Sequence, residues 1–134
     1  MDRQWINDFW AKIENKLSVV APQVETPFPY TINDEGKYIP YNNRYDSQWW
    51  TNGFWGGILW LAYKESKREC YQKLAIACEE ALDQSFLDFY DLGHDVGFMW
   101  HLTAVEHYKL DGDEKAKYRG LHAATLLAGR FNCQ

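Results

Sequence analysis

The chain has 134 residues, which is enough for one domain with a hydrophobic core. Its net charge is −5 and its Lys and Arg residues form no cluster, which argues against a nucleic-acid partner because phosphate binding needs concentrated positive charge. No apolar run approaches the ~20 residues of a membrane span, and the first residues lack the apolar centre of a signal peptide. We therefore expect no membrane partner.

Hydrophobic periodicity predicts five helices and no strand. The first covers residues 4 to about 20 and ends at Pro22. A long connection over residues 21–48 holds all four prolines, and a loop of that length in a compact domain often has a function. The remaining helices are expected over about 51–65, about 69–86, from about 95 to the turn at 111–113, and about 114–130.

The second expected helix opens the most unusual stretch of the chain, residues 49–60, which holds four of the seven tryptophans. Thr51 is a suitable N-cap, because its hydroxyl can satisfy a free backbone N–H group. Apolar residues cover more than one stripe of the helix, which predicts burial almost all round. Three glycines reduce helix propensity here, so we expect another helix or a ligand to approach closely at Gly53, Gly56 and Gly57.

Trp49 and Trp50 precede this helix and are less easily explained as core residues. Aromatic rings at the mouth of a helix offer flat apolar area with a polar edge, which is what a sugar-binding surface needs.

An internal repeat links the second and fourth helices. Gly53-Phe54 and Gly97-Phe98 are 44 positions apart, as are Ile58 and Leu102. A single helical hairpin cannot bury its own apolar face, so hairpins of this kind stack. We therefore predict an all-α fold in which about two and a half hairpins form part of an α/α toroid. The starts of the two helices should lie at one end of it, with Trp50 and Asp95 on the same rim.

Asp95 is the best candidate for chemistry, and it follows His94 at the start of the fourth helix. One interpretation is an N-cap that stabilises the helix by about 1 kcal/mol. The other is a carboxylate facing a cavity shared with Trp50. A histidine such as His94 is more often structural than a ligand. The spacing of Asp91, His94 and Asp95 matches no strong metal-ligand pattern, so we expect no metal and no cofactor.

The three cysteines predict reduced thiols. Cys70 and Cys78 on one helix would lie about 12 Å apart along its axis, whereas a disulfide needs Cα atoms within about 7 Å. Together with Cys133, they favour a cytoplasmic protein.

Two motifs resemble the unsaturated glucuronyl hydrolases, glycoside hydrolase family 88. They read Trp50-Thr51-Asn52-Gly53-Phe54-Trp55-x-Gly57-x-Leu59-Trp60 and His94-Asp95-Val96-Gly97-Phe98. The long connection and the last turn also look similar to that family, at Phe28-Pro29, Lys37-Tyr38 and Asp111-Gly112-Asp113-Glu114-Lys115-Ala116. The resemblance covers nearly the whole chain but only about the first third of a typical member.

The resemblance implies an (α/α)6 barrel of six hairpins and a carbohydrate substrate. Family members remove a 4,5-unsaturated uronic acid from the non-reducing end of lyase-generated oligosaccharides, including those from glycosaminoglycans. An acid protonates C4, water captures the cation at C5, and the hemiketal opens to release the neighbouring sugar. Asp95 matches a family aspartate that contacts the sugar ring and has a catalytic role. Trp50 and His94 match substrate-contacting positions.

The chain departs from the family in two respects. Gly93 stands where many members have a histidine. The second catalytic aspartate of the family belongs to a later helix, beyond this chain. We therefore expect residues 1–134 to be the N-terminal, incomplete part of one toroid domain and to be inactive alone. Its uncovered apolar faces would favour self-association.

Two alternatives remain at this point. The related unsaturated rhamnogalacturonyl hydrolases share the fold and the chemistry, although the Trp50–Trp55 motif argues against them. A non-catalytic helical-hairpin module would bind sugar or protein whether or not Asp95 is present.

Overall fold

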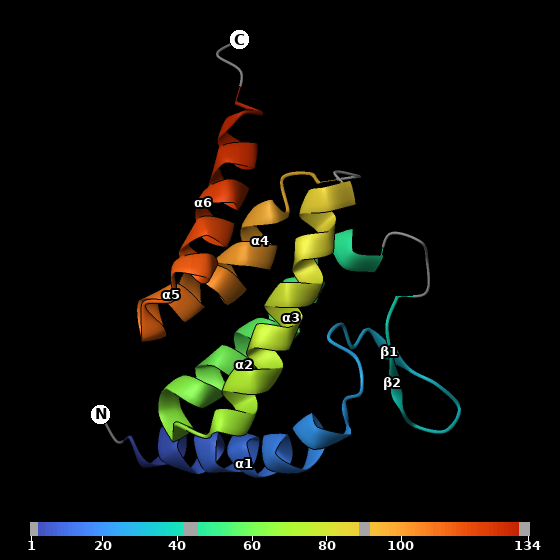
Figure 1. Cartoon of the computed structure of the whole chain (residues 1–134). Helices are drawn as coiled ribbons and strands as arrows, with labels where there is room; N and C mark the ends of the chain where they lie inside the picture. Colours follow the sequence, from blue (N-terminus) through green and yellow to red (C-terminus); the bar gives the residue numbers. More distant parts are fainter. Residues whose placement is uncertain (1–2, 42–45, 89–91, 132–134) are drawn as a thin grey trace.

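The computed structural model describes residues 3–41, 46–88 and 92–131, and it is built almost entirely of helices (Figure 1). Helix α1 spans Gln4–Val20, α2 spans Asn52–Ser66, α3 spans Glu69–Asp88 and α6 spans Glu114–Ala128. Between α3 and α6 one helical segment runs through α4 (Val96–Trp100), a π-helical turn (His101–Val105) and α5 (Glu106–Asp111). These five helical stretches agree with the five predicted from periodicity.

The prediction that the chain has no strand is wrong. β1 (Thr31–Ile32) and β2 (Tyr38–Ile39) pair antiparallel within the long connection. The turn between them is closed by the side chain of Asn33, whose Oδ1 accepts the backbone N–H groups of Glu35 (3.1 Å) and Lys37 (2.9 Å). Gly36 takes a left-handed φ of +77°, which glycine adopts without strain. Strands of two residues are too short to show an alternating pattern.

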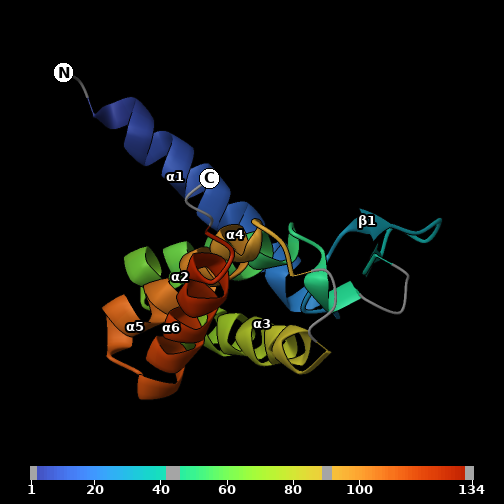
Figure 2. The ribbon, with the colours of Figure 1, turned by 90° about the horizontal axis from the view of Figure 1, so that it is seen from above.

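The core lies in two parts, one against the first half of α3 and the other against its second half. The first part joins α2, α3 and the end of α1, around Leu59, Trp60 and Tyr71. The second joins α3, the α4–α5 segment, α6 and Phe28 of the connection, around Leu82 and Trp100. Helix α1 lies across the end of the α2–α3 hairpin, and its N-terminal half projects beyond the other helices (Figure 2). That half leaves large apolar side chains exposed, at Trp5, Ile6 and Phe9.

The three glycines of α2 lie where the α4–α5 segment packs against it, and we call them the glycine seam (Gly53, Gly56 and Gly57). A Cβ on Gly53 would lie 2.5 Å from Met99 Cα, one on Gly56 2.8 Å from Thr103 Cγ2, and one on Gly57 3.0 Å from Leu102 Cβ. The expectation that another helix approaches closely at these glycines is confirmed. Gly53 meets residues 98–99, whereas Gly56 and Gly57 meet residues 102–103, one turn farther along, so α2 and the α4–α5 segment lie parallel and begin at the same end.

The prediction that α2 is buried almost all round is wrong. Phe54 is 40% exposed, Ile58 44% and Leu61 56%, whereas Leu59 and Trp60 are buried. The reason is that the neighbours of α2 cover the glycine seam and the side facing α3, and leave the side of Phe54 and Ile58 open. None of the helices in the described ranges is long and apolar enough to cross a bilayer.

Candidate active site

The starts of α2 and α4 are joined by an aromatic cluster of Trp50, Phe54 and Phe98. The ring centroids of Trp50 and Phe54 are 5.7 Å apart, those of Trp50 and Phe98 6.2 Å, and those of Phe54 and Phe98 6.2 Å. Phe54 and Phe98 are equivalent positions of the internal repeat. Trp50 is 40% exposed, so much of its indole ring is open to a ligand. The structure therefore brings Trp50 to the first turn of α4, as the repeat predicts.

Asp95 occupies the N-cap position of α4, but its carboxylate does not cap the helix. Only its backbone carbonyl takes part in the first turn, where it accepts the N–H groups of Phe98 (2.8 Å) and Met99 (3.3 Å). Thr51 likewise occupies the N-cap position of α2 without a side-chain capping bond. The Asp95 side chain is 32% exposed. Its oxygens are thus accessible and are not used by the helix terminus, which is the condition for contact with a substrate.

His94 lies beside this carboxylate. Its Nε2 is 3.4 Å from Asp95 Oδ1, and its side chain is 89% exposed. A solvent-exposed pair at this distance contributes little to stability. His94 is therefore not a packed structural histidine, and its ring is accessible at the same end of the helices as Trp50.

A cavity of about 580 Å³ lies between the start of α2, the end of α1 and the β1–β2 hairpin. Trp50, Phe54 and Ile58 line it from α2. Tyr30 lines it from the hairpin, where the Tyr41 ring, with its centroid 4.9 Å away, packs edge-on against it. Among the described residues that line it none is charged, and neither His94 nor Asp95 is one of them.

The candidate metal ligands near Asp95 are only partly described. Asp91, which could have joined His94 and Asp95 as a ligand, lies outside the described residues. Among the residues that are described, no group of three or more His, Cys, Asp and Glu side chains is placed to hold a metal ion. Cys70 and Cys78 are free thiols, as their spacing predicts, while Cys133 is also outside the described ranges.

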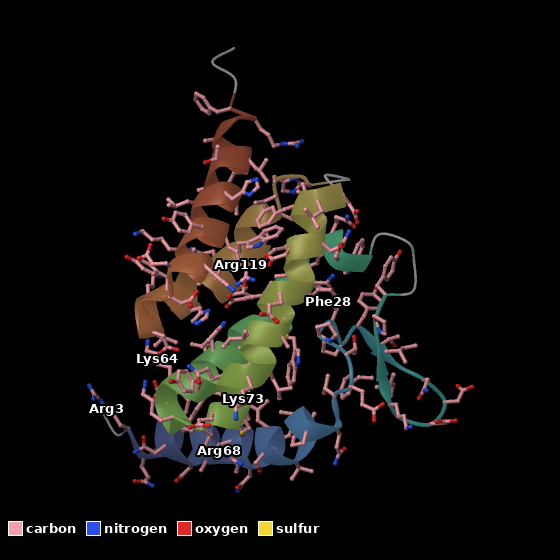
Figure 3. All side chains as sticks on the ribbon, viewed as in Figure 1. Arg3, Phe28, Lys64, Arg68, Lys73 and Arg119 are labelled. Atoms are coloured by element: carbon pink, nitrogen blue, oxygen red, sulfur yellow. The ribbon has the colours of Figure 1, made fainter. Side chains whose placement is uncertain are left out.

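A buried polar cluster was missed by the sequence analysis. Glu79 of α3 is 0% exposed and accepts a hydrogen bond from Trp60 Nε1 at 2.7 Å. Its other oxygen lies 3.1 Å from His107 Nδ1 and 3.4 Å from Arg119 Nη1. We call these four residues the Glu79 cluster; Figure 3 shows Arg119 in the space between α6 and α3. The available signal was a glutamate on the apolar stripe of α3, next to Cys78.

Comparison with known proteins places these features in context. No family model matches the chain. It is 34% identical to the unsaturated glucuronyl hydrolase of Bacillus sp. (strain GL1) over 78% of its own length and 27% of that protein. It is 33% identical to the unsaturated chondroitin disaccharide hydrolase of Streptococcus pneumoniae (strain ATCC BAA-255 / R6) over 90% of its length and 31% of that protein.

A solved structure gives the same result. The chain superimposes with a TM-score of 0.66 and 32% identity on an unsaturated glucuronyl hydrolase Asp→Asn variant with the oligosaccharide dGlcA-Glc-Rha-Glc, covering 78% of this chain and 27% of that one. The all-α fold of hairpins predicted from the sequence, as part of an α/α barrel, is confirmed. The chain spans about a third or less of the length of these relatives.

Proposed function

The chain belongs to the unsaturated glucuronyl hydrolases, and on this basis we propose that it supplies one rim of an active site that hydrates the C4=C5 bond of an unsaturated uronic acid. The substrate would be the non-reducing end of a lyase-generated oligosaccharide of the glycosaminoglycan type. Names of relatives that act on unsaturated chondroitin disaccharides support this class.

One observation carries the proposal. The Asp95 carboxylate stands at the mouth of a helix without capping it, at the same end as the exposed ring of Trp50. A sugar ring stacked on Trp50 would present its hydroxyl groups to a carboxylate in this position. His94, highly exposed and 3.4 Å from Asp95, would contact the same ligand.

The chemistry requires an acid that donates a proton to C4 and a group that orients the water that attacks C5. On this chain we assign a catalytic role to Asp95, whose carboxylate would contact the sugar ring. The second aspartate implied by the family resemblance would come from another part of the barrel. Residues 1–134 would then be part of a single toroid domain, without turnover of their own. A cytoplasmic location, suggested by the free thiols, belongs to the same proposal.

The first test is binding of an unsaturated chondroitin disaccharide by isothermal titration calorimetry. We expect Asp95→Asn and Trp50→Leu each to weaken binding by about tenfold or more, because one removes a charged hydrogen-bond acceptor and the other the stacking surface. Asp8→Asn, the same change on exposed α1, should leave the affinity unchanged. If Asp95→Asn bound as well as the unmodified chain, the non-catalytic binding module would be favoured.

Turnover is measured in parallel, by the ultraviolet absorbance of the conjugated enol-carboxylate, which hydration removes. We expect no loss of absorbance with this chain alone. Turnover that Asp95→Asn abolished would support the role of Asp95 and contradict the need for a second aspartate.

A further inference from the structure

The β1–β2 hairpin projects from the side of the helices (Figures 1 and 2), and three aromatic rings join it to the segment that leads into α2. Tyr41, shortly after β2, stacks on Trp49 with 4.7 Å between the ring centroids and 7° between the ring planes. Tyr30, just before β1, meets both of these rings edge-on, with centroids 4.9 and 6.1 Å away. Stacked and edge-on pairs at these separations attract each other. We call these three residues the Tyr41 cluster.

Ring packing holds the side chain of Trp49. Its indole N–H group is buried and has no hydrogen-bond partner in the part of the chain that the structure describes. The backbone carbonyl of Trp49 accepts the N–H group of Asn52 at 2.9 Å, which closes the turn at residues 49–52. A displacement of the Trp49 ring would therefore be passed on to the turn from which α2 begins.

Trp50 projects from the middle of the same turn. Its ring meets Phe54 and Phe98 with centroids 5.7 and 6.2 Å away, and it stays 40% exposed. A side chain that is already held in its binding position loses less conformational entropy when the ligand binds. The rigidity of the turn at residues 49–52 therefore affects how tightly Trp50 can bind a sugar.

We propose that Tyr41 is a positioning residue of the candidate active site, because its stack on Trp49 fixes the turn that presents Trp50 to the sugar. The proposal rests on the function proposed above, since it takes Trp50 as the stacking surface. Tyr41 acts through Trp49 and does not itself touch the sugar. The role requires an aromatic ring at position 41 but not a hydroxyl group.

The affinity for an unsaturated chondroitin disaccharide, measured by isothermal titration calorimetry, tests the requirement for the ring. Tyr41→Leu should weaken binding by about three- to tenfold, because the Trp50 ring must then be ordered when the sugar binds. Tyr41→Phe keeps the stack and should bind as the unmodified chain does. Tyr118→Leu, the same change at a tyrosine of α6 that is 65% exposed, should also leave the affinity unchanged. Circular dichroism checks that each variant keeps its helices.

A double-mutant cycle separates positioning from a general loss of structure. In a Trp50→Leu chain there is no indole ring left to position, so adding Tyr41→Leu should weaken disaccharide binding no further. If Tyr41 only supported the fold, the same substitution would lower the affinity by the same factor with and without Trp50.

A second measurement needs no ligand. The seven tryptophans each give an indole N–H signal in a ¹⁵N NMR spectrum, and the signal of Trp50 is the one that Trp50→Leu removes. We expect Tyr41→Leu to shift or broaden this signal, and Tyr41→Phe and Tyr118→Leu to leave it in place.

Two results would overturn the proposal. One is a Trp50 signal that Tyr41→Leu leaves unchanged. The other is a loss of affinity in Tyr41→Leu that is equal in the presence and absence of Trp50. The function proposed above fails separately, if Asp95→Asn and Trp50→Leu both bind the disaccharide as the unmodified chain does. The Trp50 signal would still show whether Tyr41 positions that ring.

Discussion

Cys78 and Glu79 are neighbours on α3, and both side chains are buried. Each forms hydrogen bonds with different partners. The Cys78 thiol donates a hydrogen bond to the Pro27 carbonyl oxygen at 3.3 Å and so connects the long connection to α3. Burial and the nearby Glu79 raise the pKa of Cys78 to about 12. The thiol therefore stays protonated at neutral pH and is a packing group, whereas Cys70 on the same helix is exposed.

Alkylation by iodoacetamide at pH 8 should distinguish the two thiols. We expect Cys70 to react in the native chain and Cys78 to react only in urea, because the thiolate is the nucleophile and burial suppresses it. Mass spectrometry of the separate peptides measures both. The raised pKa also means that the stability contributed by protonated Cys78 is complete below its unfolded pKa near 9 and falls as pH rises toward 12. Modification of native Cys78 at pH 8 would contradict its burial.

At the scale of the helix, the glycine seam determines how closely α2 and α4 approach. Glycine lowers the stability of a helix at these three positions. The close contact between the backbones of the two helices offsets this loss. Gly53 is the position of α2 that tolerates a side chain least. An added Cβ there would meet backbone atoms of Phe98 and Met99, which cannot rotate away. Gly97, the equivalent residue of the next repeat, has no atom of the described residues within 4 Å of an added Cβ.

This contrast makes a matched pair of substitutions. Gly53→Ala should destabilise the chain by about 1–3 kcal/mol, because the two helices must separate to admit the methyl group. Gly97→Ala should instead stabilise it by up to about 1 kcal/mol, because alanine favours the helix. Urea unfolding followed by circular dichroism measures both. Equal effects of the two changes would show that the close helix contact is not what selects glycine at position 53.

At the scale of the whole molecule, the Glu79 cluster joins four helices. Trp60 comes from α2, Glu79 from α3, His107 from α5 and Arg119 from α6. The Trp60 and His107 rings are also stacked, with centroids 4.3 Å apart. Arg119 forms two further hydrogen bonds with Asp83, at 2.7 and 2.6 Å. The cluster therefore fixes α2 and α5 relative to each other and to α3 and α6.

Glu79→Gln should lower the free energy of unfolding by about 2–4 kcal/mol at pH 7. The amide leaves Arg119 with one carboxylate fewer and brings an N–H group into a site that already holds donors. Glu80→Gln, at the next position, which is exposed, should change the free energy of unfolding by less than about 0.5 kcal/mol. Urea denaturation gives both values. A Glu79→Gln chain as stable as the unmodified one would mean that the cluster is held by packing alone.

The sequence by itself determined the helices, their order, the repeat and the two motifs. Those features are local: an apolar period, a proline or a turn residue acts on its own few neighbours, and so the ends of α1, α2, α3 and α6 fall close to their predicted places. The two-residue strands were missed because their pairing depends on a turn, not on a pattern.

The tertiary structure alone decided which face each helix covers. Periodicity shows that α2 is apolar on several sides, but only its neighbours show that the glycine seam is covered and Ile58 is open. Likewise, the sequence allowed Asp95 to be a cap or a free carboxylate, and only the structure shows that its side chain makes no capping bond. Glu79 looked like any helical glutamate until its partners, 19 to 40 residues away in sequence, were brought together. Such contacts join distant parts of the chain, and no local pattern specifies them.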